Sequence, residues 1–342
     1  MSIEPPIIIA TRGSALALAQ ANAVLARCRV EFPKLAFELS VIKTTGDKLQ
    51  TASLANPDAS LPKGLFTKEL EVALLEKQAD LAVHSLKDLP VDLPAGLRLG
   101  AVCKRADVRD VLIYRDAERV RAEAAVPRVE EWVTGQRIKR GFRRGTKLQD
   151  FPTDMVVATS SPRRKAQLLA LRPEWAVVEL RGNVPTRLQK LADQATMDAI
   201  VLAAAGLQRL KFVIFPDGSL RGEGVPAGLW TIRIEPEQML PCVGQGAVGI
   251  EVREGDERIA PVLAALNHFT TEHAVRAERA FLRGMGGGCA TPVGAYAEVL
   301  GHQIRLRVVS FVGGTMKRAE AKRPVKEAEA LGEMLARELG GK

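Results

Sequence analysis

The sequence predicts α/β domains with mainly parallel sheets, followed by a separate small α+β domain at the C-terminal end. Three observations lead to this fold class. The 342 residues exceed what a single hydrophobic core usually serves. Short apolar strands repeatedly lead through a polar turn into an amphipathic helix, which is typical of parallel sheets. From residue 256 onward this alternation is replaced by two helical patterns, a glycine-rich loop, two strands and a final helix.

The expected elements follow in order. Residues 7–10 form a strand, and a helix over 15–28 begins after Ser14, which is suited to cap it. Leu70 and Leu74 lie on the apolar face of a second helix pattern, in residues 64–80. Further strands are expected at 37–43, 81–83, 155–158, 177–180 and 199–202, with helices at 165–171, 187–193 and 325–339. Residues 116–152 and 212–236 break the pattern and are interpreted as insertions.

The bulk properties exclude several classes of protein. No apolar run approaches the roughly 20 residues that span a bilayer, so no membrane association is expected. The net charge is +9, and the segment 137–147 alone holds six basic residues. Aromatic residues are only 4% of the chain, and no basic strand carries the aromatic spacing of an RNA-binding motif. We therefore expect no nucleic-acid partner and interpret 137–147 as a solvated surface hairpin.

Cysteine and histidine usage indicates a cytoplasmic protein without a metal. The four cysteines lie far apart and form no CxxC pair, so they are expected to be reduced thiols rather than disulfides or zinc ligands. The four histidines, at 84, 268, 273 and 302, have no metal-ligand spacing.

Arginine and serine side chains dominate the turns between strands and helices. Helix N-termini favour anions, and arginine adds two-pronged recognition of carboxylates. The sequence has no GxxxxGK[ST] loop and no GxGxxG after a strand, so a nucleotide is not indicated. The pattern favours a ligand with several separate carboxylates; the alternative, helix caps paired with surface acids, stays open for each arginine. The residues are Arg12, Arg163, Arg164, Arg181 and Arg187, with Ser14, Ser160 and Ser161 beside them.

Two residues are candidates for the chemistry itself. Asp88, in HSLKDLP, follows a buried strand that delivers it among the arginine turns, although a turn residue before proline is the alternative. Cys289, in RGMGGGCATPVG, follows glycines that let the backbone fold closely around whatever the thiol holds. A buried structural cysteine is the alternative here. No histidine lies near it in sequence, so covalent attachment is favoured over acyl transfer.

The segments ATRGSALALAQA, HSLKDLP, TSSPRRKAQL, LRGNVPTRL, VGQGAVGIE and GGGCATPVGAYAE resemble the porphobilinogen deaminase (hydroxymethylbilane synthase) family, in the family's order and over nearly the whole chain. The resemblance implies a monomeric, cytoplasmic transferase of tetrapyrrole biosynthesis. Such an enzyme condenses four porphobilinogen molecules head to tail with loss of ammonia, and releases hydroxymethylbilane by hydrolysis. It implies two lobes like those of type II periplasmic binding proteins, with the active site between them. A third domain carries a dipyrromethane cofactor on a cysteine thioether.

The resemblance also implies domain bounds and roles. Domain 1 covers 1–105 and 247–265, domain 2 covers 106–246, and domain 3 covers 266–342. Asp88 is the carboxylate next to the cation formed as ammonia leaves, and Cys289 holds the cofactor. The other cofactor-binding positions are Ser85, Lys87, Thr159, Ser161, Arg163, Arg164, Arg181 and Arg187. The substrate-binding positions are Arg12, Ser14, Gln20, Lys63, Phe66, Arg181, Arg209, Gln245 and Gly246, with a mobile loop at 44–63.

Two other classes stay open from the residues alone. A two-lobed binding protein without chemistry would lack a covalent pyrrole adduct. A nucleic-acid-binding protein would show salt-dependent retention on DNA that is lost when residues 137–147 are deleted.

Overall fold

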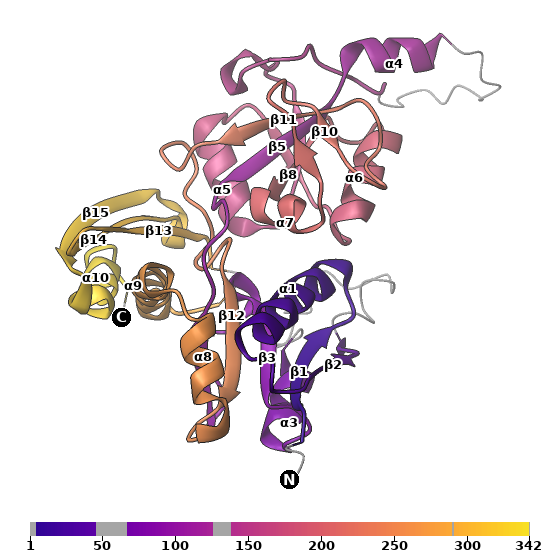
Figure 1. Ribbon diagram of the computed structural model, residues 1–342. Helices are drawn as coiled ribbons and strands as arrows, with labels where there is room; N and C mark the ends of the chain where they lie inside the picture. Colours follow the sequence, from indigo (N-terminus) through magenta and orange to yellow (C-terminus); the bar gives the residue numbers. More distant parts are fainter. Residues whose placement is uncertain (1–4, 46–66, 126–137, 289–290, 342) are drawn as a thin grey trace. The chain divides into compact units, whose positions relative to one another are not determined.

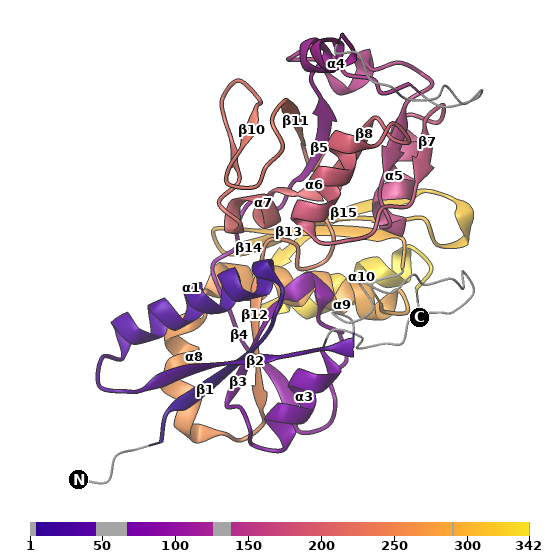
Figure 2. The same ribbon diagram turned by 90° about the vertical axis from the view of Figure 1, so that its right-hand side faces the viewer.

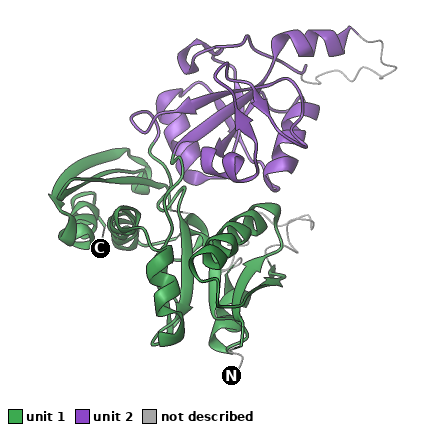
Figure 3. Ribbon diagram, viewed as in Figure 1, with its two compact units in different colours: residues 1–108, 240–342 green, residues 109–239 purple. Residues whose placement is uncertain are grey.

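The computed structural model describes residues 5–45, 67–125, 138–288 and 291–341 (Figure 1). The chain divides into two compact units, coloured separately in Figure 3. Unit 1 contains residues 1–108 and 240–342, and unit 2 contains residues 109–239. The chain therefore passes from unit 1 into unit 2 once and returns once.

Unit 1 is built on a five-stranded sheet with the order β2-β1-β3-β12-β4. β1 pairs in parallel with β2 and β3, whereas β12 pairs antiparallel with both β3 and β4. Four strands thus share one direction and β12 runs against them. The strands are β1 (Ile7–Arg12), β2 (Phe37–Ile42), β3 (Leu81–Ser85), β4 (Leu97–Val102) and β12 (Val248–Arg253).

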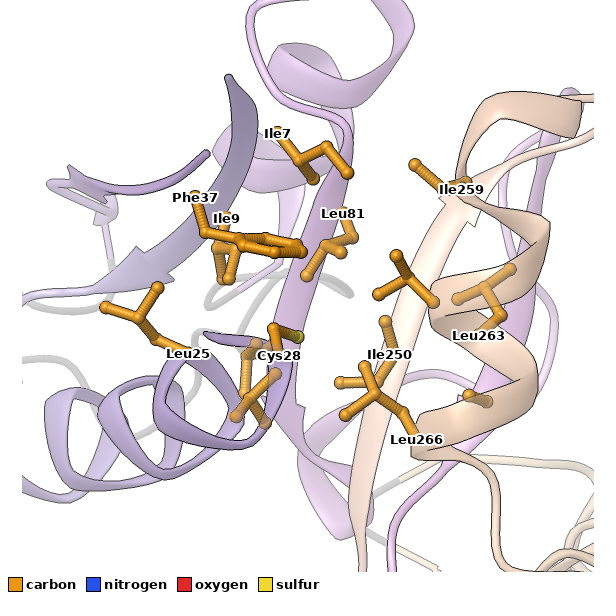
Figure 4. Close-up of a cluster of buried hydrophobic side chains, with 14 of the residues drawn as sticks. Ile7, Ile9, Leu25, Cys28, Phe37, Leu81, Ile250, Ile259, Leu263 and Leu266 are labelled. Atoms are coloured by element: carbon orange, nitrogen blue, oxygen red, sulfur yellow. The ribbon is translucent and has the colours of Figure 1, made fainter. Parts of the chain in front are cut away.

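Helices cover both faces of this sheet. Side chains alternate between the faces along each strand, and apolar side chains on both faces need to be buried. On one face Ile9 and Leu81 pack against α1 (Ala15–Glu31) and α8 (Ala260–Leu266), as the close-up in Figure 4 shows. On the other face Ala10 and Ala82 pack against Leu70 of α3 (Lys68–Leu75). Figure 2 shows α3 and α8 on opposite sides of the strands. The carboxyl ends of β1 and β3 stay free of these cores, and there the chain turns into α1 and into the short 3₁₀ helix η1 (Leu86–Asp88).

Unit 2 repeats this plan with the order β11-β5-β8-β6-β7. β6 pairs in parallel with β7 and β8, while β5 runs antiparallel to β8 and β11. The strands are β5 (Asp110–Arg115), β6 (Val156–Ala158), β7 (Ala176–Val178), β8 (Ala199–Ala203) and β11 (Leu229–Ile234), with β9 (Val213–Ile214) and β10 (Leu220–Arg221) in a separate pair. The helices are α4 (Ala117–Ala124), α5 (Pro162–Leu171), α6 (Val184–Asp193) and α7 (Ala204–Arg209).

The two sheets are mixed rather than mainly parallel in their pairing, which corrects the expectation from sequence. In each sheet, two strand pairs are parallel and two are antiparallel. The reversed strands are β5 and β12, the first strands after the chain passes into unit 2 and back into unit 1. A strand that enters from elsewhere in the chain needs no crossover helix, so the local strand–helix alternation carries no signal for it.

The C-terminal part of unit 1 is an antiparallel sheet with two helices, as expected for a small α+β domain. Its three strands follow the order β13-β14-β15, and α9 and α10 pack against them around Phe281, Leu306 and Leu331. The elements are α9 (Phe269–Gly284), β13 (Val293–Leu300), β14 (Gln303–Ser310), β15 (Lys317–Pro324) and α10 (Ala328–Glu338). None of the helices within the described ranges has the length and apolar character needed to cross a membrane.

The segments interpreted as insertions are partly built into unit 2. The second, 212–236, contains β11, an edge strand of the main sheet. Within the described part of the basic segment, Phe142 pairs with the Arg115 backbone and its ring packs 5.0 Å from that of Phe151. Arg140 donates to buried Asp198 at 2.5 Å. This part is therefore anchored to the unit 2 core and is not a freely solvated hairpin.

Candidate active site

The carboxyl ends of β1 and β3 bring five predicted site residues to one pocket. The two strands are parallel neighbours, so their ends meet at the same edge of the sheet. There they form a pocket of about 50 Å³ in unit 1. It is lined by Arg12, Ser14, Gln20, Ser85 and Asp88, together with Leu16, Ala17, Thr67, Val83 and His84.

Hydrogen bonds within unit 1 fix the pocket walls. The Ser14 hydroxyl accepts from the Ala17 amide at 3.3 Å and caps α1, as the sequence predicts. Buried Gln20, on the same helix, exchanges a hydrogen bond of 2.9 Å with the Ser85 hydroxyl at the end of β3. These contacts hold the start of α1 against the turn that carries Asp88.

Asp88 is the last residue of η1 and its side chain is exposed, whereas Leu86 in the same turn is buried. The Leu86 amide donates to the Ala247 carbonyl at 3.1 Å and anchors the turn to the connection that leads into β12. Lys87, between them, is half-buried. The arrangement presents a solvent-accessible carboxylate beside cationic, amide and hydroxyl side chains.

His84, in the wall of this pocket, belongs to a buried titratable cluster that could not be predicted from the sequence. His84 Nε2 lies 2.9 Å from Glu251 Oε2, and both side chains are almost fully buried. Burial also raises the pKa of Glu71, on α3. Spacing could not reveal the cluster, because the three residues come from β3, β12 and α3.

In unit 2 the turn after β6 holds three predicted residues. Buried Thr159 accepts from the Ser161 amide at 3.2 Å, and Ser161 accepts from the Arg164 amide at 3.4 Å as the cap of α5. Pro162 then opens this helix, where proline is well tolerated. The turn therefore presents hydroxyls at a helix N-terminus.

Arg163 and Arg164 are buried and share one carboxylate. Arg163 Nη1 donates to Asp110 Oδ2 at 2.7 Å, and Arg164 Nη2 donates to Asp110 Oδ1 at 2.8 Å. Burial alone would raise the pKa of Asp110, but the two guanidinium groups outweigh it and hold that pKa well below its usual range. Sequence reasoning missed Asp110, which lies more than 50 residues away at the start of β5. A cofactor-binding role for the two arginines stays a prediction.

The other predicted site arginines of unit 2 lie in or next to the terminal turns of helices. Arg187, in the first turn of α6, donates from Nε to the Gly182 carbonyl at 2.7 Å. Asn183 caps that helix. Arg181 is half exposed beside Glu179, and Arg209 lies in the last turn of α7. Their placement at turns agrees with anion recognition, and their ligands stay predicted.

Gln245 and Gly246 hold together the two stretches of unit 1 that connect to unit 2. Buried Gln245 donates from Nε2 to the Val108 carbonyl at 2.7 Å. Gly246 has a φ of +84°, and a Cβ there would lie 2.7 Å from the Ala106 carbonyl oxygen. These contacts are structural, and a substrate-binding role for either residue stays a prediction.

Three predicted residues lie outside the described residues: Lys63, Phe66 and Cys289. Most of the predicted loop at 44–63 lies there too. The glycines that precede Cys289 are described. Gly286, Gly287 and Gly288 all have positive φ, at +93°, +56° and +127°, so this backbone suits glycine. The described ranges hold no group of three or more His, Cys, Asp or Glu side chains that could bind a metal ion.

The side chains present fit a pyrrole ligand that bears carboxylates. Arginine and serine groups at the strand ends are donors for acetate and propionate. An exposed Asp88 carboxylate is an acceptor for pyrrole N–H groups. Such a fold and donor set are those of an α/β enzyme that acts on a small anionic substrate.

Comparison with known proteins then gives the family. The family model described as "Porphobilinogen deaminase, dipyromethane cofactor binding domain" matches residues 7–261, and "Porphobilinogen deaminase, C-terminal domain" matches residues 273–341. The chain belongs to the porphobilinogen deaminase family, a family of transferases of tetrapyrrole biosynthesis whose cofactor is dipyrromethane.

Three curated relatives carry the name porphobilinogen deaminase, and each is 42% identical to this chain. The one from Desulforudis audaxviator aligns over 332 residues, 96% of this chain and 93% of its own length. Those from Thermus thermophilus and Moorella thermoacetica each cover 97% of this chain, and 95% and 92% of their own lengths. Among solved structures, the BenM effector-binding domain with benzoate is similar at a TM-score of 0.39 and 14% identity, over 81% of this chain and 91% of that domain. This likeness is too low to bear on the fold.

Proposed function

We propose that this chain condenses four porphobilinogen molecules head to tail, with loss of ammonia at each step, and releases hydroxymethylbilane by hydrolysis. The growing chain is attached through a dipyrromethane on the Cys289 thiol. Family membership over nearly the whole chain supports the reaction. The observation that carries the site is the unit 1 pocket, in which Asp88 lies with Arg12, Ser14 and Gln20.

Asp88 would act on the substrate's aminomethyl group. Positive charge develops on that carbon as ammonia leaves, and a carboxylate about 4 Å away stabilises it by roughly 4 kcal/mol at an effective dielectric near 20. The same carboxylate would accept hydrogen bonds from pyrrole N–H groups and so orient the ring. Dipyrromethane, when bound, supplies the pyrrole carbon that accepts the first substrate unit.

The cationic side chains would bind the acetate and propionate groups. Arg12 lies in the same pocket as Asp88, and Arg181 and Arg187 lie at the start of α6 in unit 2. Two-pronged guanidinium–carboxylate pairing fixes both position and orientation. A product that gains two carboxylates with every step needs such dispersed cations. The further binding positions in this proposal are Ser85, Lys87, Thr159, Ser161, Arg163, Arg164, Arg209, Gln245 and Gly246, with Lys63 and Phe66.

The proposal includes the finer architecture expected from sequence. The lobes are of the type II periplasmic-binding-protein kind, with domain 1 at 1–105 and 247–265, domain 2 at 106–246 and domain 3 at 266–342. Each sheet has four strands in one direction and one reversed, in matching order, which supports two related lobes. We further propose a monomer located in the cytoplasm, to be checked by sedimentation and cell fractionation.

The intact mass of the purified protein tests cofactor, residue and reaction together. A thioether survives denaturation, so protein from a host that makes porphobilinogen should exceed the sequence mass by two linked pyrrole units. Limiting porphobilinogen should then add a ladder of single-pyrrole increments. Cys289→Ala should lose the adduct and the activity.

The other three cysteines are the matched controls. Cys28→Ala, Cys103→Ala and Cys242→Ala should each keep the adduct. A wild-type mass equal to the bare chain, in protein that still consumes porphobilinogen, would show that attachment through Cys289 is wrong. A bare chain that binds porphobilinogen without consuming it would instead indicate a binding protein.

A further inference from the structure

The residues that follow the Asp88 turn, Leu89 to Asp92, are held by two arginines of α9; we name this segment the strap. Arg279 donates to the carbonyl oxygens of Leu89, Pro90 and Val91 at 3.2, 2.6 and 3.1 Å. One turn later, Arg283 donates to Asp92 Oδ1 at 3.0 Å. All of these residues belong to unit 1, so the contacts lie within one unit.

Arg279 is an unusual group to bury for structure alone. Its side chain is almost fully buried, and burial lowers its pKa to about 10, so it is still a cation at neutral pH. Its hydrogen bonds to the strap all go to backbone carbonyls, and the strap carboxylate of Asp92 bonds instead to Arg283. A planar guanidinium can bond three successive carbonyls at once, which fixes the path of the strap in a way that one ammonium group cannot.

The strap also lies beside residues 285–288, the glycine-rich loop that leads to Cys289; we name these residues the attachment loop. α9 ends at Gly284, and the next residues fold back, with the Gly287 amide donating to the Leu282 carbonyl at 2.9 Å. A Cβ at Gly287 would lie only 3.2 Å from Val91 Cγ2. The strap thus begins at the proposed catalytic carboxylate and contacts the attachment loop two residues before the proposed attachment point.

We propose that Arg279 is a positioning residue that holds the strap, and that the strap sets the attachment loop against the Asp88 turn. This inference rests on the proposed function. In this role Arg279 acts through the strap, by fixing the distance between the tethered pyrrole chain and the Asp88 carboxylate. Chemistry of this kind is sensitive to displacements of about 1 Å, which can cost on the order of a hundredfold in rate.

The first test compares Arg279→Lys with wild type, both loaded with cofactor as judged by intact mass. We expect the kcat for porphobilinogen, per loaded molecule, to fall about ten- to a hundredfold, with a much smaller change in KM. The matched control is Arg276→Lys, on the exposed side of the same helix, where the arginine pairs with Glu329 at 3.2 Å. That variant should keep the wild-type kcat.

The outcomes distinguish a failure of the proposed role of Arg279 from a failure of the proposed function. An Arg279→Lys protein that melts at a lower temperature but keeps the wild-type kcat per loaded molecule would make Arg279 merely structural and overturn the inference. Wild-type protein without an adduct or without porphobilinogen consumption would overturn the proposed function instead.

A second test is independent of the arginine and decides the question if Arg279→Lys does not fold. Gly287→Ala inserts a methyl group against Val91 at a backbone position of positive φ. The part of the fall in kcat that comes from the methyl contact should be reversed in the double variant with Val91→Ala. Gly286→Ala is the control, since its φ is also positive but no atom lies within 4 Å of its Cβ. Val91→Ala should not relieve that variant. If the fold-change in kcat of the double variant equals the product of the fold-changes of the two single variants, the strap and the loop are not coupled.

Discussion

At the scale of single residues, the proposed catalytic role of Asp88 rests on its environment. Its carboxylate is exposed in the pocket that also holds Arg12, while Leu86 and Leu89 on either side are buried and fix the backbone. The informative change therefore removes the charge of the Asp88 carboxylate and keeps the length of the side chain. Asp88→Asn should fold normally and lower the rate of porphobilinogen consumption about a hundred- to a thousandfold, as measured by steady-state kinetics.

Asp88→Glu is the companion variant, because it keeps the charge and displaces it by one methylene. It should retain a measurable fraction of activity, well above that of Asp88→Asn. Equal and mild losses in both variants would reduce Asp88 to a turn residue.

What the sequence predicts at this scale depends on how local each contact is. Ser14 and Ser161 cap their helices as expected, because a cap bonds an amide within three residues. The pairing of Arg163 and Arg164 with Asp110 joins residues more than 50 positions apart, and nothing in the local pattern announces it. The same is true of His84 and Glu251.

At the scale of elements, Asp110 joins the start of β5 to the first turn of α5. Removing its charge would leave two buried guanidinium groups without their shared carboxylate. Asp110→Asn should therefore destabilise unit 2 by about 3–5 kcal/mol, measured by chemical denaturation. Asp150→Asn, at an exposed position of the same unit, should cost less than about 0.5 kcal/mol.

The pH dependence of the free energy of unfolding tests the same ion pairs. The pKa of Asp110 is lowered in the folded chain, so its contribution is fully present above the ordinary carboxyl pKa of about 4. The contribution is lost progressively as pH falls below that value. Wild type should lose stability relative to Asp110→Asn as pH falls below about 4. If the free energy of unfolding of the two proteins changed equally with pH, the arginines would not lower the pKa of Asp110.

The elements that sequence reasoning found are those with local signals. β1, β3, β6 and β8 were expected because each leads directly into a helix or turn. β5 and β12 were missed, and their reversed direction comes from pairing with strands far away in sequence. β11 was hidden in a segment interpreted as an insertion, because its partner β5 precedes it by more than 100 residues.

At the scale of the whole chain, Glu278 of α9 joins the stretches by which the chain leaves and re-enters unit 1. It accepts hydrogen bonds from Arg105 Nη1 and Nη2 at 2.6 and 3.0 Å and from the Gly244 amide at 2.8 Å. The Ala297 amide, on β13, donates to it at 2.9 Å. A fully buried carboxylate with four donors therefore fixes the outgoing chain, the returning chain and the C-terminal sheet to one helix.

Only part of this organisation could be predicted from the sequence. The family resemblance gave two lobes and a C-terminal part, because its motifs span the chain in order. The contact that joins Arg105 to Glu278 spans 173 residues, and both side chains occur in segments that read locally as ordinary turn and helix.

Glu278→Gln is expected to be among the most destabilising substitutions in unit 1. The amide keeps one acceptor oxygen but places a donor toward groups that already donate, and it leaves the Arg105 charge largely buried without its carboxylate. The loss should be about 3–5 kcal/mol, which corresponds to a melting temperature lower by about 6–20 °C in calorimetry. Glu329→Gln, at an exposed ion pair, should lower it by no more than a degree or two. Because the cost arises mainly from the stranded cation, adding Arg105→Gln to Glu278→Gln should cost far less than the two single losses combined. Additive losses would show instead that the two side chains stabilise the unit independently.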